Sequence, residues 1–193
     1  MGLFTSNSFE LNLPEWVDSV LENYNGNFRC HKSCMEFVIH LAKMNVEKNT
    51  GGPFGAAVVD RENGRVVAPG VNCVVQSNSS IAHAEILALT LAQRHLKVFS
   101  FSGKKFASLE LITSCEPCAM CIGAIVWTGI QSVVCGARDE DVRKIGFDEG
   151  PKSPTWIAEL SGRNILVYQD VCREQAVNVL SLYKAKGGLI YNG

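Results

Sequence analysis

Two short apolar runs frame a helical segment in the second half of the chain, and this strand–helix–strand order constrains the fold more than any other feature. LELITS (109–114) and SVVCGA (132–137) have the length and composition of buried strands. Between them, 118–128 follows Pro117, whose fixed φ suits a first helical turn. Strands joined by a helix favour parallel pairing through a right-handed crossover. The segment therefore predicts an α/β sandwich.

The rest of the chain continues this alternation. Helical spacing or flanking signals predict helices at 31–48, 82–96, 154–160 and 170–186. Strands are expected at 54–60, 65–76 and 164–168. Internal repeats and low-complexity tracts are not visible, so we expect 1–193 to form a single domain in which 1–13 is a weakly ordered arm.

Composition excludes several classes of protein. Of 193 residues, 47% are hydrophobic and 19% charged, which is typical of a globular chain rather than a disordered one. The net charge is −1 and no long basic run appears, so a polymeric nucleic acid is not the expected partner. Apolar stretches are too short for a membrane span. Eight cysteines without a recognisable signal peptide favour a reducing compartment, and we expect the cytoplasm.

Two helix starts carry the residues that could bind a metal or take part in catalysis. If the strands at 71–76, 109–114 and 132–137 are neighbours, right-handed crossovers place the helices at 82–96 and 118–128 on one face of the sheet. Both helices then begin at the carboxyl edge, where open α/β folds bind ligands. One start reads His-Ala-Glu (83–85) and the other Pro-Cys-Ala-Met-Cys (117–121). The sequence therefore predicts that these two segments meet.

The two segments together suit a zinc ion. Cys118 and Cys121 are three residues apart and share a helix face, and a helix N-terminus lowers the pKa of a thiol. With His83 they make three ligands for one tetrahedral zinc with an open position, which is typical of a catalytic site. Cys115 precedes Pro117 and is interpreted as a neighbour. A thioredoxin-like redox pair is the alternative, but it leaves the histidine and glutamate of 83–85 without a role.

Glu85 is predicted to move protons. A zinc ion with an open position activates water at neutral pH, and a carboxylate beside it can take a proton from the water and pass it to a ring nitrogen and a departing amine. Alone, Glu85 would be interpreted as an ordinary first-turn glutamate favoured by the helix dipole. Together, 83–85 and 117–121 match the H-x-E…P-C-x-x-C signature of zinc nucleobase deaminases.

At these residues the chain resembles the cytidine deaminase-like superfamily, and within it the guanine deaminase branch. The resemblance covers about 50–150, through GGPFGA (51–56), GVNCVV (70–75), AHAEI (82–86), TSCEPCAMC (113–121), GAIVW (123–127) and GFDEG (146–150). It implies an α/β/α sandwich of three layers around a central five-stranded mixed sheet, and a homodimer. Some members of the family exchange C-terminal segments between subunits.

The resemblance also implies residue roles. His83, Cys118 and Cys121 take the positions of ligands to one Zn²⁺ per chain, and Glu85 that of the proton shuttle. The position of Phe54 is one where relatives stack an aromatic ring on the base. Asn72 matches a side-chain amide that hydrogen-bonds the base, and its expected place inside a strand favours function because asparagine suits strands poorly.

Three further residues complete the expected site. Trp127 is expected to form a wall of the pocket. In GFDEG, similar enzymes use an acidic residue for recognition and for proton transfer. Guanine presents a ring N–H beside its amine, two donors that one carboxylate accepts together. We prefer Glu149 for this role, and Asp148 is the alternative. If neither has a functional role, the acidic residues of this stretch simply form a solvated loop. The segment 164–193, which ends in GGLIYNG, is expected to cover the pocket or to be exchanged in the dimer.

The sequence therefore predicts a zinc-dependent aminohydrolase that converts guanine to xanthine and ammonia. Alternatives within the same chemistry are deaminases of an ammeline-like triazine, guanosine, cytosine or, with less support, the adenosine of a tRNA. A zinc-binding scaffold without catalysis is the alternative outside enzymes, although the presence of Glu85 speaks against it.

Overall fold

The computed structural model describes residues 10–24 and 26–192. Within them, five strands form one mixed sheet in the order β2-β1-β3-β4-β5. The strands are β1 (Gly55–Asp60), β2 (Arg65–Val71), β3 (Leu109–Cys115), β4 (Ser132–Ala137) and β5 (Leu166–Tyr168). β1 pairs antiparallel with both β2 and β3, whereas β3, β4 and β5 run parallel. The predicted five-stranded mixed sheet is confirmed.

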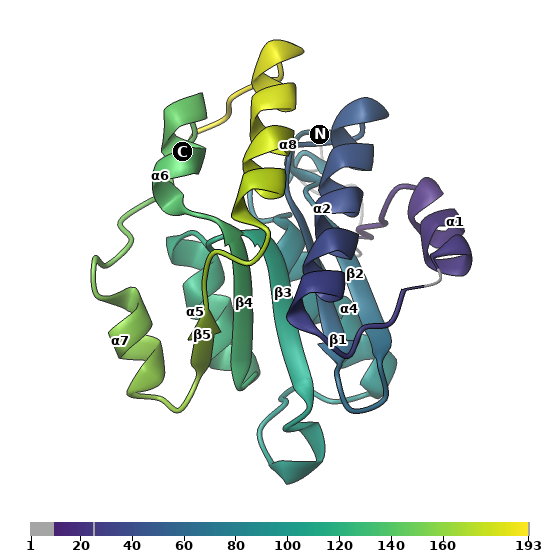
Figure 1. The fold of residues 1–193 in the computed structure, drawn as a ribbon, viewed down its shortest axis with the longest axis vertical. Coiled ribbons are helices and arrows are strands. Elements are labelled where there is room, and N and C mark those ends of the chain that lie inside the picture. The colour runs from purple at the N-terminus through teal and green to yellow at the C-terminus, as the bar shows by residue number, and fades with distance from the viewer. Residues whose placement is uncertain (1–9, 25, 193) are drawn as a thin grey trace, which may run out of the picture.

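Helices cover both faces of the sheet, so the molecule has three layers (Figure 1). α2 and α8 lie over one face, and α4 and α5 over the other. The helices are α1 (Trp16–Asn23), α2 (His31–Glu47), α3 (Val74–Ser77), α4 (Ala84–Leu96), α5 (Ala119–Thr128), α6 (Asp139–Ile145), α7 (Trp156–Ser161) and α8 (Arg173–Ala185), with a 3-10 turn η1 (Lys104–Phe106). No helix in the described ranges is long and apolar enough to cross a membrane.

The central strands explain why the sheet needs both layers. Every residue of β3 and of β4 is buried, in agreement with their nearly continuous apolar sequences. Alternate side chains enter opposite cores: Ile112 and Val134 face α2 and α8, and Leu111 and Val133 face α4 and α5. Each fully buried side chain of this size stabilises the fold by about 1.5–3 kcal/mol relative to exposure.

The carboxyl ends of β3 and β4 lie at the same edge as the starts of α4 and α5, as predicted. The reason differs from the expected one, because β2 is not a neighbour of β3; β1 is inserted between them. β2 and β3 nevertheless run parallel, so α4 is still a crossover. At Gly70 a Cβ would stand 2.8 Å from the backbone nitrogen of Ala88, so glycine permits α4 to pack closely on β2.

The strand predicted over 65–76 ends early. β2 stops at Val71, and the short helix α3 follows. The side chain of Asn72 accounts for this, because its Oδ1 accepts a hydrogen bond from the backbone nitrogen of Val74 at 3.4 Å. An asparagine that bonds the chain two residues ahead favours a turn over a strand ladder. The expectation that Asn72 lies inside a strand is therefore wrong.

Besides α3, two helices were not predicted. α1 precedes the first predicted helix, and α6 lies in the polar stretch after β4. α6 begins where the backbone nitrogen of Arg138 donates to Asp141 Oδ2 at 3.0 Å, and it ends at Gly146, whose φ is 115°. Arg173 Nε donates to Asp141 at 2.7 Å and so joins α8 to α6. This ion pair lowers the pKa of Asp141 to about 2. α6 is short and polar, so it lacks the apolar spacing that identifies a core helix.

Candidate active site

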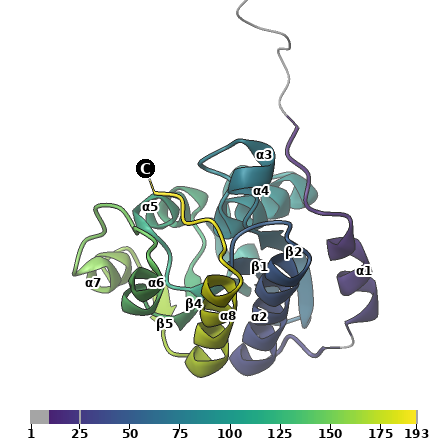
Figure 2. The same cartoon turned by 90° about the horizontal axis from the view of Figure 1, so that it is seen from above.

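A cavity of about 340 Å³ opens at the carboxyl edge of β3 and β4. The starts of α4 and α5 lie on one side of it, and the loop after α6 on another. Figure 2 views this edge from above and shows the segment after α8 crossing toward α5. The last described residues, Tyr191 and Asn192, line the cavity. Asn192 accepts a hydrogen bond from the backbone nitrogen of Asp148 at 2.8 Å, which fixes the C-terminal segment to the loop after α6.

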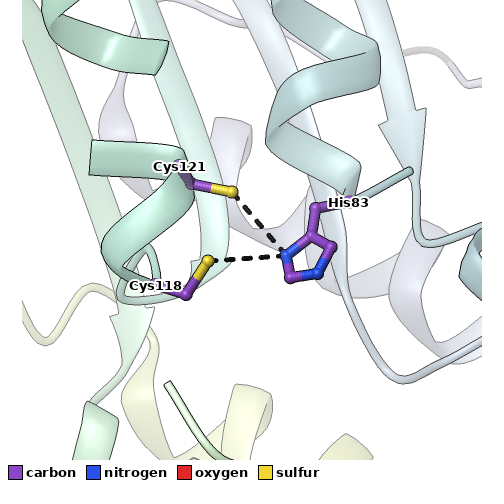
Figure 3. A group of neighbouring side chains, drawn as sticks. All are labelled: His83, Cys118 and Cys121. Atoms are coloured by element: carbon purple, nitrogen blue, oxygen red, sulfur yellow. Dashed lines mark hydrogen bonds between the residues drawn. The ribbon is translucent and has the colours of Figure 1, made fainter. Parts of the chain in front are cut away.

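Three donor atoms converge at the two helix starts (Figure 3). His83 Nδ1 lies 3.5 Å from Cys118 Sγ and 3.7 Å from Cys121 Sγ, and all three atoms are within 4.8 Å of one another. Tetrahedral zinc with ordinary Zn–S and Zn–N bonds separates a sulfur from a nitrogen ligand by about 3.5 Å. The donor set and its nitrogen–sulfur distances therefore fit a zinc ion.

The helix geometry and the charges suit a metal-binding thiolate. Cys118 is the residue before the first turn of α5, and His83 holds the same position on α4. Hydrogen bonds from Cys121 and from His83 lower the pKa of Cys118 to about 4, so its thiolate form prevails at neutral pH. Thiolates are the form of cysteine that binds metal. Cys115, the third cysteine of the segment, is buried in the core at the end of β3 and is not part of the group.

Glu85 lines the cavity from the first turn of α4 and is 6% exposed. Thr113 Oγ1 donates to Glu85 Oε1 at 3.3 Å. Burial raises the pKa of Glu85, and the nearby Cys118 thiolate raises it further. A carboxyl group whose pKa is raised toward neutrality is suited to exchange protons rather than to remain permanently ionised.

Phe54 and Asn72 lie beside each other in the cavity wall. The backbone nitrogen of Asn72 donates to the carbonyl of Phe54 at 3.1 Å, which extends the pairing of β1 and β2 by one step. Asn72 is 1% exposed, and its Nδ2 has no hydrogen-bond partner among the described residues. Phe54 packs edge-on against Phe147 with ring centroids 5.2 Å apart. A buried amide donor thus stands next to an aromatic face.

The two acidic residues of GFDEG occupy different environments. Asp148 is exposed, and its Oδ1 accepts hydrogen bonds from Arg143 at 3.0 Å and from the nitrogen of Gly150 at 3.1 Å. Glu149 is 7% exposed and lines the cavity. Burial, and then the Cys118 thiolate, raise the pKa of Glu149 to about 8. A zinc cation on the thiolates would offset the second cause. Of the two, Glu149 is the carboxylate that is free to contact a ligand.

A buried ion pair connects two loops that border the cavity. Lys152 Nζ lies 3.0 Å from Glu116 Oε2, with both side chains about 5% exposed, and 4.8 Å from the ring centroid of Trp156. Glu116 lies between β3 and α5, two residues before Cys118, and Lys152 lies in the loop that carries Glu149. The ion pair therefore holds these two loops together. Glu116 also lines the cavity. Glu116 stands in the recognised motif TSCEPCAMC (113–121), but no role was predicted for it.

The structure corrects one predicted residue and adds others. Trp127 lies outside the cavity: its side chain is 86% exposed near the end of α5, so it is not a wall of the pocket within one subunit. Phe147 and Met120 line the cavity and had no predicted role, although both stand in motifs that were recognised. The remaining predicted residues, except Cys121, line the cavity, and Cys121 joins it through the metal-binding group.

Comparison with known proteins agrees with this geometry. A family model described as the cytidine and deoxycytidylate deaminase zinc-binding region matches residues 28–137. A guanine deaminase of Bacillus subtilis is 37% identical over 119 residues, which cover 62% of this chain and 72% of that protein. A tRNA-specific adenosine deaminase of Buchnera aphidicola is 30% identical over 135 residues, which cover 70% of this chain and 82% of that protein.

A solved structure extends the similarity over most of the chain. The guanine deaminase from Nitrosomonas europaea superposes with a TM-score of 0.87 at 39% identity, covering 94% of this chain and 99% of that one. The segments that this similarity spans include all three layers of the sandwich.

Proposed function

The chain belongs to the family of deaminases that carry the cytidine and deoxycytidylate deaminase zinc-binding region, and from that premise we propose that it hydrolyses guanine to xanthine and ammonia. The buried carboxylate of Glu149 carries the choice of base, because it lines the same cavity as the zinc donors. Guanine offers this carboxylate two adjacent donors, its ring N–H and its amine. The similarity to guanine deaminases from two organisms supports the same choice.

The cavity is suited to a free base rather than to a tRNA. Its volume of about 340 Å³ is at the lower end of the range for small-molecule sites. The C-terminal residues Tyr191 and Asn192 close one side of it. A net charge of −1 also offers little attraction to a polyanion. We therefore rank guanine above the adenosine of a tRNA, although both activities occur among the relatives.

In the proposed complex, the base lies against Phe54 and within reach of two polar groups. The free Nδ2 of Asn72 donates to an acceptor atom of the purine, and Glu149 accepts from the ring N–H and the amine. These three contacts orient the amine-bearing carbon toward the metal-binding group. Because each polar group is buried, a base that lacks the matching donor or acceptor leaves it unpaired, and this penalty provides selectivity.

Glu85 carries the proton in the proposed reaction. The oxygen of a water molecule bonds to C2 of guanine, and the bond from C2 to the amine nitrogen breaks. Glu85 takes one proton from the water and delivers it to N3 of the base; it then carries the remaining hydroxyl proton to the amine, which leaves as ammonia as the C2 carbonyl forms. Thr113 holds one carboxylate oxygen of Glu85 while the other serves the substrate. His83, Cys118 and Cys121 would hold the zinc ion, which supplies the activation of water at neutral pH when bound.

A panel of substrates tests the proposed function. Zinc-loaded protein is incubated with guanine, guanosine, adenine, cytosine, ammeline and an unmodified tRNA, and ammonia release is measured. We expect rapid turnover of guanine and slow or no turnover of the others. If another base is turned over instead of guanine, zinc-dependent deamination remains supported, but the role of Glu149 in selecting guanine is contradicted. No ammonia from any of them would favour a scaffold without catalysis.

Replacing Glu149 with glutamine should lower kcat/KM for guanine by about 100-fold or more, because the amide places a donor where two substrate donors need an acceptor. Asp148→Asn is the matched control: it changes the adjacent carboxylate, which is exposed and paired with Arg143, and should leave kcat/KM within a few-fold. Steady-state kinetics of both variants make the comparison. A larger loss in Asp148→Asn than in Glu149→Gln would reverse the assignment.

We also propose that the protein is a cytoplasmic homodimer of single-domain subunits, each covered by its own C-terminal segment. α5 supports a dimer, since Ile122 and Val126 pack against the core yet remain partly exposed, and Trp127 is exposed. A helix that is apolar on both sides is typical of an interface. All eight cysteines are unpaired, which suits a reducing compartment.

Introducing a charge on this helix tests the dimer. Trp127→Glu should convert the protein to a monomer, because a carboxylate in an apolar interface loses its hydration without gaining a partner. Light scattering on a sizing column gives the mass of each form. Leu189→Glu is the control, since Leu189 is 60% exposed beside α8, on the opposite face of the sheet from α5, and should leave the mass unchanged. A Trp127→Glu protein with the same mass as wild type would remove α5 from the interface.

A further inference from the structure

The side chain of Asn45 is a fully buried amide on the apolar face of α2, in the last turn of the helix. Its Nδ2 donates two hydrogen bonds, to the carbonyl of Gly52 at 2.9 Å and to the carbonyl of Asn72 at 2.9 Å. Its Oδ1 accepts from Thr50 Oγ1 at 2.8 Å. Both amide protons and the acceptor are therefore used, and all the partners belong to segments that approach the cavity.

These hydrogen bonds connect two segments that are far apart in the sequence. Gly52 precedes β1, and Asn72 follows β2. The segments approach so closely that a side chain on Gly51 would collide with the carbonyl of Asn72 and the amide nitrogen of Asn45. An apolar side chain at position 45 would leave the carbonyl of Asn72 buried without this donor, a loss that typically costs about 1–3 kcal/mol.

The same junction fixes the orientation of the Asn72 side chain. Its Oδ1 accepts hydrogen bonds from the backbone nitrogens of Gly52 at 3.3 Å and Val74 at 3.4 Å. An amide whose oxygen faces two N–H donors must point its nitrogen the other way. The Nδ2 of Asn72 is accordingly the atom left without a partner among the described residues, in a side chain that lines the cavity.

Phe54 depends on the junction as well. Its backbone nitrogen donates to the carbonyl of Gly52 at 2.9 Å, and its carbonyl accepts from Asn72 at 3.1 Å. The carbonyl of Gly52 thus receives hydrogen bonds from both Asn45 and Phe54. Any movement of Gly52 would shift the aromatic ring and the amide donor relative to each other.

On the side away from the cavity, the network continues to the N-terminal helix. Trp16 Nε1 in α1 donates to Thr50 Oγ1 at 3.0 Å, and Thr50 in turn donates to Asn45. The hydroxyl of Thr50 therefore has a fixed direction, which selects the amide orientation that Asn45 must adopt. Hydrogen-bonded chains of this kind hold their members more rigidly than isolated pairs.

We propose that Asn45 is a positioning residue for the purine base: by joining Gly52 to Asn72 it sets the free amide donor of Asn72 and the ring of Phe54 in the orientation that the base requires. Asn45 does not line the cavity and acts only through these two residues. This inference rests on the proposed function, and it adds a residue on α2 to base recognition.

A double-mutant cycle tests the proposal, with guanine turnover by wild-type protein established first. Asn45→Ala should raise KM for guanine about 10-fold, equivalent to one well-made hydrogen bond, and change kcat by less than about 3-fold. In the Asn72→Ala background, the same substitution should change KM by less than about 2-fold, because the group that Asn45 positions is absent. Ser132→Ala is the control for lost stability, since it removes a buried hydrogen bond to Glu110 far from the cavity.

The outcomes separate positioning from a purely structural role. Equal effects of Asn45→Ala in both backgrounds, or a fall in kcat at unchanged KM, would overturn the proposal. An increase in KM in Ser132→Ala as large as that in Asn45→Ala would also overturn it. If Asn45→Ala does not accumulate as folded protein, Asn45→Ser replaces it in the cycle, because its small hydroxyl side chain retains one donor. If wild-type protein fails to deaminate guanine, it is the proposed function that fails, and the cycle is not needed to show it.

Discussion

The Glu85→Gln variant should bind guanine and zinc but turn over at a rate about 100-fold to 10,000-fold lower than wild type, the range that a positioned proton donor and acceptor contributes. Glutamine preserves the shape of the side chain and the acceptor for Thr113 Oγ1, which lies 3.3 Å from Glu85 Oε1. It cannot take a proton from water. Because base binding uses other residues, the effect should fall on kcat and leave KM within a few-fold.

The measurement is steady-state xanthine formation, with the zinc content of each preparation determined in parallel. Thr113→Val is the matched control, since it removes the hydrogen bond to the carboxylate but leaves the proton carrier in place. Its kcat should decrease by about 10-fold, the lower end of the range for a hydrogen bond to a charged group, because this contact is long at 3.3 Å. A Glu85→Gln protein with full zinc content and a kcat within 10-fold of wild type would show that another group carries the proton.

Removal of a zinc ligand should abolish activity and destabilise the fold. Cys118→Ser replaces a thiolate, whose pKa is lowered to about 4 in this site, by a hydroxyl that does not ionise at neutral pH. We expect much less than one zinc per chain and a loss of activity greater than about 1,000-fold. Metal that binds only the native state stabilises it by about 4 kcal/mol at 1,000-fold excess over Kd, so the unfolding temperature should decrease as well.

Cys115→Ala provides a control within the same nine-residue segment. Cys115 is buried in the core and does not belong to the group of donor atoms, so its variant should keep one zinc per chain and most of the activity. Metal analysis, turnover and thermal unfolding of the two variants give three independent comparisons. Full zinc content in Cys118→Ser, or loss of zinc in Cys115→Ala, would mean that the ligand set is wrong.

The sequence was sufficient to predict the parts of the site that depend on regular elements. β3 and β4 are continuous apolar runs, and the helices before and after β3 begin with recognisable residues. Right-handed crossovers then bring His83 and Cys118 to one edge whether or not β2 and β3 are neighbours. This explains why the insertion of β1 between them, which was not predicted, left the prediction of the metal-binding group correct.

Parts of the site that depend on side-chain hydrogen bonds were not predictable in this way. The side chain of Asn72 ends β2 by bonding to the chain ahead of it, a choice between turn and strand that apolar spacing does not indicate. Asn45 falls on the apolar stripe of the helix predicted at 31–48, at the spacing of Val38 and Leu41, but spacing does not indicate which carbonyls its amide bonds. Trp127 stands in a recognised motif, yet its direction depends on the rotation of α5 about its axis.

The different environments of Asp148 and Glu149 could not be predicted from the sequence either. Both carboxylates line the cavity, and only the turn at 146–150 determines that Glu149 is the buried one and Asp148 the exposed one. Arg143 binds Asp148 from α6, a helix that the sequence did not predict. The partner of Asp148 is therefore supplied by an element whose lack of apolar spacing hides it from sequence analysis.

Hydrolysis of guanine in isotopically labelled water tests the central claim most directly. Zinc-loaded protein is incubated with guanine in water enriched in ¹⁸O, and xanthine and ammonia are quantified together by mass spectrometry. The account predicts equal amounts of the two products and one solvent oxygen in each xanthine, at a rate that Glu85→Gln lowers by at least about 100-fold. Unchanged guanine, or xanthine that forms equally fast with the variant, would contradict it.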